Sequence, residues 1–348
     1  MLRVAIGVTE VTEQVARLVA DAEALGAHSV WAPEAWGYDA LTPLAFLAAR
    51  TSTIRLGSGI AQLGARTPAM LAMSALSLQA LSGGRFLLGL GVSGPQIMEG
   101  WHGVRFAAPL RATRETVEIV RAIAAGHRLD YQGGAYQIPL PGGAGRPIRS
   151  MVAPAPVPIY LAALGPRNLE LTGELADGWI GNAFIPESAS AFVDHLQAGA
   201  SRAGRSLDGL DLLIPVSLEI TDDVAEAAAR HAAGYAFTIG AMGSATQNFY
   251  NAAFSRQGFA EDVQAVQQLW LAGKREEAAA RVPRDIGFKT NLIGPPEIIR
   301  DRLRLYRAAG VTTLQVKSAG QGRATLDAIA ALIDLVDEVN REGQPRRD

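Results

Sequence analysis

Residues 4–31, VAIGVTEVTEQVARLVADAEALGAHSVW, contain the pattern on which the fold prediction depends. A short apolar run at 4–8 is followed by a stretch in which apolar side chains recur at helical spacing. These side chains are Val15, Leu18, Val19, Ala22 and Leu25. Gly26 then favours the end of a helix, and a second apolar run follows at 29–31. A strand, a helix and another strand in this order are typical of a parallel sheet.

The same alternation continues along the chain and gives eight strand-like runs. The runs are 4–8, 29–31, 54–56, 86–90, 159–163, 178–180, 212–216 and 313–316. Helical segments lie between them, including one at 43–50. Eight strand–helix units favour an α/β fold of the closed (β/α)8 TIM-barrel type. An open doubly wound sheet is the alternative that the pattern leaves.

Two stretches interrupt the alternation, so we expect one barrel domain over 1–348 with insertions after the fourth and seventh strands. The first insertion, at about 128–158, holds Gly133-Gly134 between two β-prone runs, which predicts a hairpin with a two-residue turn. The second, at about 235–281, is rich in aromatic residues and is predicted to be helical. It is either a packed excursion or a cover over an apolar pocket at the carboxyl ends of the strands.

Composition excludes several classes of protein. The 348 residues are 49% hydrophobic, which is incompatible with intrinsic disorder. The 32 basic and 34 acidic residues give a net charge of −2, so we expect neither nucleic acid nor a membrane as the partner. The chain has no cysteine, which removes disulfides, thiolate metal sites and a cysteine nucleophile. No signal peptide or membrane-spanning run is visible, and the expected location is cytoplasmic.

The glycine-rich motif at 89–94, GLGVSG, matches the G-x-G-x-x-G spacing of nicotinamide-binding proteins. It follows the fourth strand rather than the first, and Pro95 with the residues after it makes a poor helix, so the nicotinamide interpretation is weak. The glycines would instead let a strand end approach a flat ring closely. The histidines lack metal-ligand spacing, and we predict no metal site, but His102 is a candidate proton donor in a strand-end loop.

Three strand ends carry groups suited to a ligand. After the second strand, Glu34 lies close to Trp36 in the sequence. The third strand runs into 57–60, GSGI, whose small residues permit close backbone contact. The fifth runs into 162–168, AALGPRN, where free N–H groups at a helix start and the nearby Arg167 would suit a phosphate. All three ends lie on the same face of a parallel barrel, which indicates a single site.

These segments resemble the luciferase-like monooxygenase superfamily, and more closely its branch of deazaflavin (coenzyme F420)-dependent oxidoreductases. The resemblance covers nearly the whole chain. It rests on seven segments in a fixed order: WAPEAW at 31–36, IRLGSGI at 54–60, ARTPA at 65–69, LSGGRF at 81–86, LGLGVSGPQ at 88–96, YLAALGP at 160–166 and ELADGW at 174–179.

The resemblance implies a barrel that holds the deazaflavin at the carboxyl ends of its strands, against a bulge with a cis peptide at Gly59–Ile60. The cofactor contacts that it implies, with Arg167 as an addition, are Ser58, Gly59, Ile60, Val92, Ser93, Gly94, Gln96, Ala163, Leu164, Gly165, Pro166 and Arg167. It also implies an acidic residue near the ring at Glu34, which is our first candidate for the proton donor. The other candidates near the ring are Tyr38, Asp39, Glu99 and His102. The aromatic residues Trp36, Trp101 and Phe184 are predicted to contact an apolar substrate.

Two departures from the resembling enzymes bear on activity. Ala35 stands where several of them have a histidine, and Gly94 stands where the sugar-phosphate dehydrogenases carry a glutamate. The expected function is hydride transfer between F420 and a small apolar molecule with an activated C=C, C=N or C=O bond, or an alcohol in reverse. The alternatives are an FMN-dependent monooxygenase and a deazaflavin-binding protein without catalysis. A homodimer is a further expectation from the resemblance.

Overall fold

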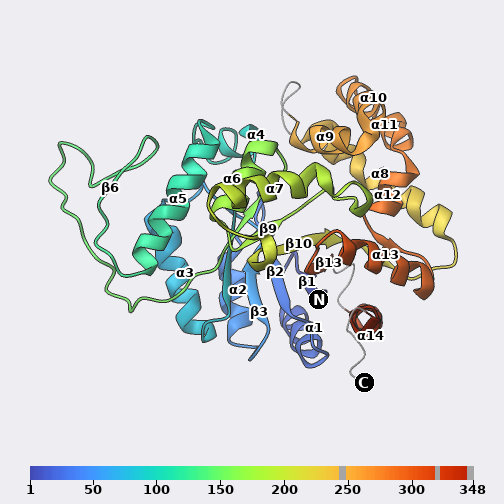
Figure 1. Cartoon of the computed structure of the whole chain (residues 1–348), viewed down its shortest axis with the longest axis horizontal. Helices are drawn as coiled ribbons and strands as arrows, with labels where there is room; N and C mark the ends of the chain where they lie inside the picture. Colours follow the sequence, from blue (N-terminus) through green and yellow to red (C-terminus); the bar gives the residue numbers. More distant parts are fainter. Residues whose placement is uncertain (243–247, 318–321, 343–348) are drawn as a thin grey trace.

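The computed structural model describes residues 1–242, 248–317 and 322–342, and its centre is a closed barrel of parallel strands (Figure 1). The barrel strands are β1 (Arg3–Gly7), β2 (Ser29–Ala32), β3 (Arg55–Ser58), β5 (Phe86–Gly91), β8 (Ile159–Ala162), β9 (Gly178–Ile180), β10 (Asp211–Val216) and β13 (Thr313–Lys317). They neighbour one another in the order β3-β2-β1-β13-β10-β9-β8-β5, and β5 closes the ring by pairing with β3. All eight predicted strands and the closed barrel are confirmed.

Helices follow the strands and surround the barrel. They are α1 (Glu13–Ala24), α2 (Leu41–Ala48), α3 (Pro68–Ser82), α4 (Pro95–Met98), α5 (Pro109–Ala124), α6 (Pro166–Leu175), α7 (Ser190–Arg202), α13 (Pro296–Ala308) and α14 (Arg323–Glu342). The first helix begins where the Thr12 side chain accepts a hydrogen bond from the Val15 N–H (3.3 Å). It ends at Ala24, two residues before Gly26, whose φ of +96° is the left-handed conformation that favours glycine.

Two aromatic side chains fill the lumen of the barrel, and glycines make room for them. Trp31 on β2 and Tyr160 on β8 meet edge to face, with ring centroids 5.1 Å apart. A Cβ on Gly57 would lie 2.3 Å from the Trp31 ring, and one on Gly178 would lie 2.2 Å from the Tyr160 ring. Because each aromatic faces a glycine on a neighbouring strand, the lumen is a packed core rather than a channel.

The first insertion projects beside α5 and contains the predicted hairpin, with a different turn (Figure 1). Strand β6 (Tyr131–Gln132) pairs with β7 (Gln137–Ile138), and the Gly133 N–H donates to the Tyr136 carbonyl at 2.8 Å. The turn residues are therefore Gly134 and Ala135, so the prediction of a Gly133-Gly134 turn was wrong by one residue. The carboxylate of Glu115 on α5 accepts from the N–H groups of Gly134, Ala135 and Tyr136, each at 2.8 Å.

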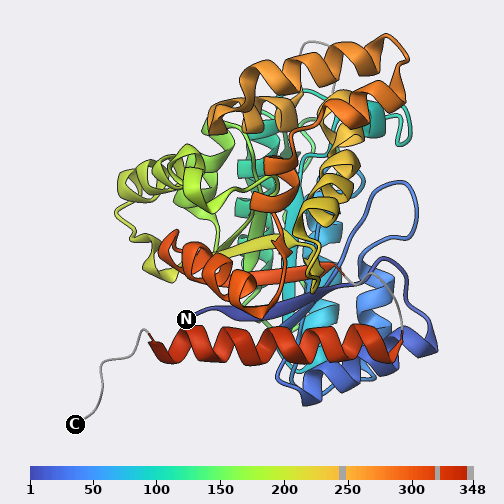
Figure 2. The ribbon, with the colours of Figure 1, turned by 90° about the vertical axis from the view of Figure 1, so that its right-hand side faces the viewer.

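The second insertion is wider than predicted. Two short strands, β11 (Leu218–Glu219) and β12 (Leu292–Ile293), pair in parallel at its base. Between them lie α8 (Val224–Ala241), α9 (Phe249–Phe254), the π-helical turn η3 (Ser255–Phe259), α10 (Ala260–Leu271), α11 (Arg275–Arg281) and α12 (Arg284–Lys289). Figure 2 shows the orange helices of this insertion at the opposite end of the molecule from the red α14, with the yellow α8 running from the barrel towards them. Residues 243–247 of the predicted insertion lie outside the described residues.

No helix within the described part of the chain is both long enough and apolar enough to cross a membrane.

Candidate functional site

The carboxyl ends of β3, β5 and β8 bring the predicted ligand-binding segments to one rim of the barrel. After β3 the peptide bond Gly59–Ile60 is cis, as the resemblance implied. After β5 the chain turns at Ser93, whose φ of +58° is left-handed, and then enters α4. After β8 it passes through 163–165 into α6. Since the three strands are parallel and lie in one barrel, the three loops share its C-terminal rim, where barrel enzymes hold their ligands.

Glycines on β5 allow β3 to approach closely at the point where the barrel closes. A Cβ on Gly89 would lie 1.8 Å from the Ser58 carbonyl oxygen, and one on Gly91 would lie 2.8 Å from the Ile60 side chain. The Ser58 hydroxyl donates to the Gly89 carbonyl (2.8 Å) and accepts from the Gly89 N–H (2.9 Å). Ser58 is fully buried and its hydroxyl joins two strands, so the role of Ser58 in cofactor binding stays a prediction.

Glu34 is held by four hydrogen bonds at this rim. Both carboxylate oxygens accept from Arg66 at 2.7 Å, and the N–H groups of Gln62 (2.9 Å) and Ala40 (3.1 Å) also donate to the carboxylate. Burial by itself would raise the pKa of Glu34, but the bonds from Arg66 and the two N–H groups outweigh it and lower the pKa. Glu34 is therefore kept ionised, the reverse of what a proton donor requires.

His102 is connected to the same group of residues through Gln62 on β4 (Ala61–Gln62). The Gln62 side-chain nitrogen donates to the carbonyl oxygens of Glu34 (3.2 Å) and Ala35 (2.8 Å). Its side-chain oxygen is consequently the acceptor at 2.8 Å from His102 Nε2. A histidine beside an acceptor carries its proton on the facing nitrogen, so Gln62 selects the Nε2–H form of His102.

The start of α6 provides a place for an anion. The helix begins at Pro166 after the cap residue Gly165, and no side chain of the described residues caps its N-terminus, so the Arg167 N–H in the first turn is open to an anion. Arg256, from η3 of the second insertion, reaches across and donates through Nη2 to the Leu164 carbonyl. Burial lowers the pKa of Arg256, and its Nε is buried without a partner among the described residues.

The second insertion is fastened to the rim at two adjacent positions. Besides the bond from Arg256, the side chain of Gln257 donates to the Ala183 carbonyl (2.6 Å) and accepts from the Ile185 N–H (2.8 Å). Ala183 and Ile185 lie in the loop after β9. This arrangement places part of the insertion against the loops after β8 and β9, as a cover over the site requires.

The three aromatic residues predicted to contact substrate separate into two groups. Trp36 (52% exposed) and Trp101 (65% exposed) lie open on loops that follow β2 and β5. Phe184 is 1% exposed and packs against Trp179 and Phe192, with ring centroids 5.8 and 5.7 Å away. Phe184 is therefore part of the packed interior, and its contact with substrate stays a prediction.

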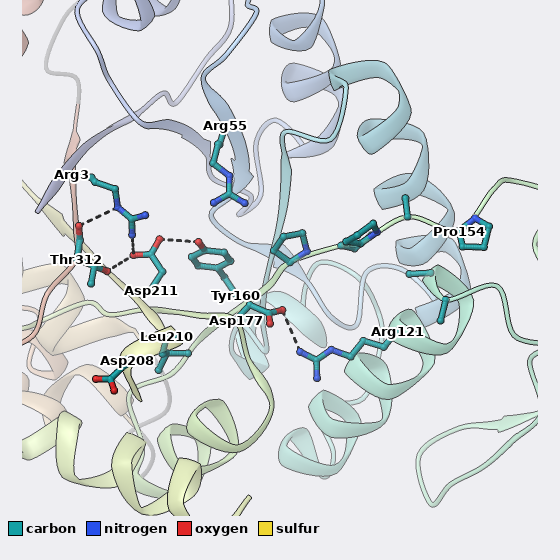
Figure 3. A pocket seen from close by; sticks show the side chains of 17 residues that line it. Arg3, Arg55, Arg121, Pro154, Tyr160, Asp177, Asp208, Leu210, Asp211 and Thr312 are labelled. Atoms are coloured by element: carbon teal, nitrogen blue, oxygen red, sulfur yellow. Dashed lines mark hydrogen bonds and ion pairs between the residues drawn. The ribbon is translucent and has the colours of Figure 1, made fainter. Parts of the chain in front are cut away.

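A cavity of about 870 Å³ lies at the opposite end of the barrel, where the strands begin (Figure 3). Asp211 at its floor accepts hydrogen bonds from Arg3 and Tyr160 (both 2.8 Å), while Arg121 pairs with Asp177 at 3.3 Å on another wall. The Trp31–Tyr160 pair stands between this cavity and the C-terminal rim. Conserved chemistry in barrel enzymes belongs to the C-terminal face, so we assign the ion pairs here to stability.

Sequence reasoning missed the residues that connect the site. Arg66 and Gln62 determine the state of Glu34 and His102, and Arg256 with Gln257 attaches the insertion. Arg66 lies within ARTPA at 65–69, one of the segments that resemble the family. That resemblance is the signal that could have identified Arg66 as a site residue. No local signal marked Gln62, Arg256 or Gln257, because the partners through which they join other loops are 27 to 92 residues away in the chain.

The fold defines the class, a (β/α)8-barrel enzyme, and the loops after β3, β5 and β8 form its candidate ligand site. Residues 3–313 match the family model described as luciferase-like monooxygenase, and the chain belongs to this family.

Named relatives agree with the deazaflavin branch. A Mycobacterium tuberculosis protein named "Putative coenzyme F420-dependent oxidoreductase" is 39% identical over 91% of this chain and 94% of its own length. The 5,10-methylenetetrahydromethanopterin reductase of Archaeoglobus fulgidus is 29% identical over 77% of this chain and 78% of its own. Among solved structures, the coenzyme F420-dependent tetrahydromethanopterin reductase of Methanopyrus kandleri superimposes with a TM-score of 0.78 at 26% identity, covering 97% of this chain and 99% of its own.

Proposed function

We propose that the chain is a coenzyme F420-dependent oxidoreductase. It would transfer a hydride between the deazaflavin and a small apolar substrate with an activated C=C, C=N or C=O bond, or an alcohol in the reverse direction. The observation that carries the proposal is the uncapped start of α6 beside Arg167, on the same rim as the small-residue ends of β3 and β5. The 39% identity to the mycobacterial relative over 91% of the chain supports the choice of cofactor.

The rim residues fit such a cofactor. At Gly94 an added Cβ would meet nothing nearer than 3.6 Å, so the backbone there is open to a flat ring. The backbone at 59–60 and at 92–94 would hold the ring, and the segment 163–166 with Arg167 would hold a phosphate. When bound, F420 supplies the carbon that gives or accepts the hydride, while the protein aligns the substrate and moves one proton.

The proton is assigned to His102 rather than to Glu34. Glu34 is held as a carboxylate by Arg66, and protonating it would break a two-pronged ion pair. Among the described residues His102 has no such ion pair, and because its Nε2–H donates to Gln62, Nδ1 is the nitrogen that would take up a proton and pass it to the substrate. The exposed rings of Trp36 and Trp101 would contact the apolar part of the substrate. Glu34 would act indirectly, by holding Arg66 and the backbone at Gln62 in place.

A binding titration tests the proposed function. Reduced and oxidised F420 are titrated into the purified chain, with FMN in a parallel series. Micromolar affinity for F420 and much weaker affinity for FMN are expected. Failure to bind F420 below the millimolar range would overturn the proposal, and tight FMN binding with oxygen consumption would favour a monooxygenase. If F420 binds but a panel of unsaturated carbonyl compounds and imines is never reduced, a binding protein without catalysis is the better description.

A further inference from the structure

A groove on the outside of the barrel begins at the proposed phosphate site. It runs between α5 and α6, which lie side by side (Figure 1), and has a volume of about 580 Å³. Its lining residues are Leu110, Arg111, Arg114, Arg167, Glu170, Leu171, Glu174 and Arg202. Arg167 is the second residue of α6 and Arg111 the third of α5, so both lie in first helical turns, next to the rim.

The groove carries an excess of positive charge. Four arginines line it against two glutamates. Arg114 forms a two-pronged pair with Glu174 (2.7 and 2.6 Å), and Arg202 pairs with Glu170 at 2.6 Å. Within the described residues, Arg111 and Arg167 have no carboxylate in ion-pair range. The guanidinium groups of Arg111 and Arg167, at the end of the groove next to the rim, are therefore available to an anionic ligand.

The first insertion lies against Arg111. The guanidinium of Arg111 packs over Gly134 in the hairpin turn, where an added Cβ would lie 2.6 Å from Nη1. That turn is itself bound to α5 through the Glu115 carboxylate. The first turns of α5 and α6 also contribute partial positive charge from their N–H groups. The end of the groove next to the rim is thus a cationic surface.

We propose that this groove binds the oligoglutamate tail of F420, an inference that rests on the proposed function. The side chain of this cofactor continues beyond its phosphate, through lactate, into γ-linked glutamates, each with a free carboxylate. With the phosphate at the start of α6, the tail leaves the rim beside Arg167 and enters the groove towards Arg111. Arginine pairs well with carboxylates in such a position. FMN ends at its phosphate and has nothing to place there, so the groove also favours F420 over FMN.

The test compares two forms of the cofactor. Dissociation constants are measured by fluorescence titration at low salt for F420 with several glutamates and for the form that ends at the phospholactate. The wild-type chain should bind the tailed form more tightly by about fivefold, since exposed ion pairs contribute up to about 1 kcal/mol each. Arg111→Gln should lose most of that preference while its affinity for the tail-less form stays within about twofold. The preference should also shrink at about 0.5 M salt.

Arg17→Gln on α1 is the matched control, since it removes an exposed arginine outside the groove and should leave both constants unchanged. The inference is overturned if wild type binds the two forms equally, or if Arg111→Gln weakens both alike. Either result leaves the proposed function intact. Failure of both forms to bind would instead overturn the proposed function, so the two failures are distinguishable.

Discussion

Arg66 and Glu34 form a two-pronged ion pair at the C-terminal rim, with Nη1–Oε1 and Nη2–Oε2 distances both of 2.7 Å. The Glu34 side chain is only 7% exposed and that of Arg66 is 20% exposed. The pair joins the loop after β2 to the segment before α3, across the loop that follows β3. Glu34 is therefore best understood as the residue that fixes the shape of the rim.

Glu34→Gln should destabilise the fold strongly. Arg66 would lose its nearer anionic partner in a largely buried position and keep only Asp39, 3.8 Å away, at a cost of about 3 kcal/mol in the free energy of unfolding. Chemical denaturation at pH 7 measures this. Glu13→Gln is the control: Glu13 pairs with Arg50 at the same 2.7 Å distance, but both side chains are about half exposed, and the loss should stay below about 1 kcal/mol. Equal losses in the two variants would contradict the structural role of Glu34.

The same pair predicts a pH dependence. Because the pKa of Glu34 is lowered in the folded state, its contribution to stability is present above the unfolded value near 4.5. It is lost as the pH falls through the folded pKa. The stability difference between wild type and Glu34→Gln should consequently be full at pH 6 to 7 and shrink below pH 4.5. A difference that stays constant into that acid range would rule out an ionised Glu34 as its cause.

Substitution by alanine should have different effects on stability at two glycines of the same segment. Gly89→Ala would put a Cβ 1.8 Å from the Ser58 carbonyl, where backbone must move, so we expect a loss of about 3 kcal/mol or more. Gly94→Ala meets only an ordinary 3.6 Å contact and should keep its stability, while its methyl group should weaken F420 binding. Thermal unfolding and titration measure the two effects. A stable Gly89→Ala would contradict the closeness of β3 and β5.

The barrel could be predicted because each of its strands is a short apolar run between helical segments, a local property of the sequence. Contacts between distant residues could not be predicted in this way. The hairpin turn was misplaced by one residue because Glu115, on a helix 19 to 21 positions earlier, binds the three turn N–H groups. The predicted second insertion is shorter than the observed one. Its base is the pair β11 and β12, which joins residues 74 positions apart through two-residue strands that leave no periodic pattern.

The candidate site shows the same division. The loops after β3, β5 and β8 could be located from glycines and helix starts. The protonation of Glu34 depends on Arg66, 32 residues later, and the burial of Phe184 depends on aromatic rings from other elements. Residue type alone therefore suggested a donor and a substrate contact, whereas the ionised state of Glu34 and the burial of Phe184 depend on partners that are distant in the sequence.

His28 should make the fold sensitive to mild acid. It lies at the N-terminal end of the barrel, with Nε2 buried and without a partner among the described residues. Burial first, and then the charges of Arg3 and Arg55, lower the pKa of His28 to about 4 against the opposing effect of Asp211. The ordinary value is about 6.5, so between these values the unfolded chain binds a proton that the folded chain does not. Stability must fall as the pH falls through this window.

His28→Gln removes that proton. Since part of the ring is accessible and solvent screens its charge, the effect should be about 1–2 kcal/mol between pH 7 and pH 4.5. Denaturant unfolding of wild type and variant across this range gives the difference curve, in which shared carboxylate titrations cancel. Parallel curves would show that His28 does not titrate differently in the folded and unfolded chains.

His102→Gln tests the proton donor. Glutamine is polar but cannot supply a proton at neutral pH, so turnover should fall by about 100-fold, a usual loss for a positioned acid. The dissociation constant for F420 should remain within about twofold, because the backbone at 59–60 and 92–94, rather than this ring, is proposed to hold the cofactor. Gln62→Leu should lower turnover less, since it removes only the acceptor that fixes the Nε2–H form. His127→Gln, on an exposed residue after α5, is the control and should leave turnover unchanged. Undiminished turnover in His102→Gln would return the search for the donor to the other rim residues, whereas a parallel loss of stability and F420 affinity would make His102 a structural residue.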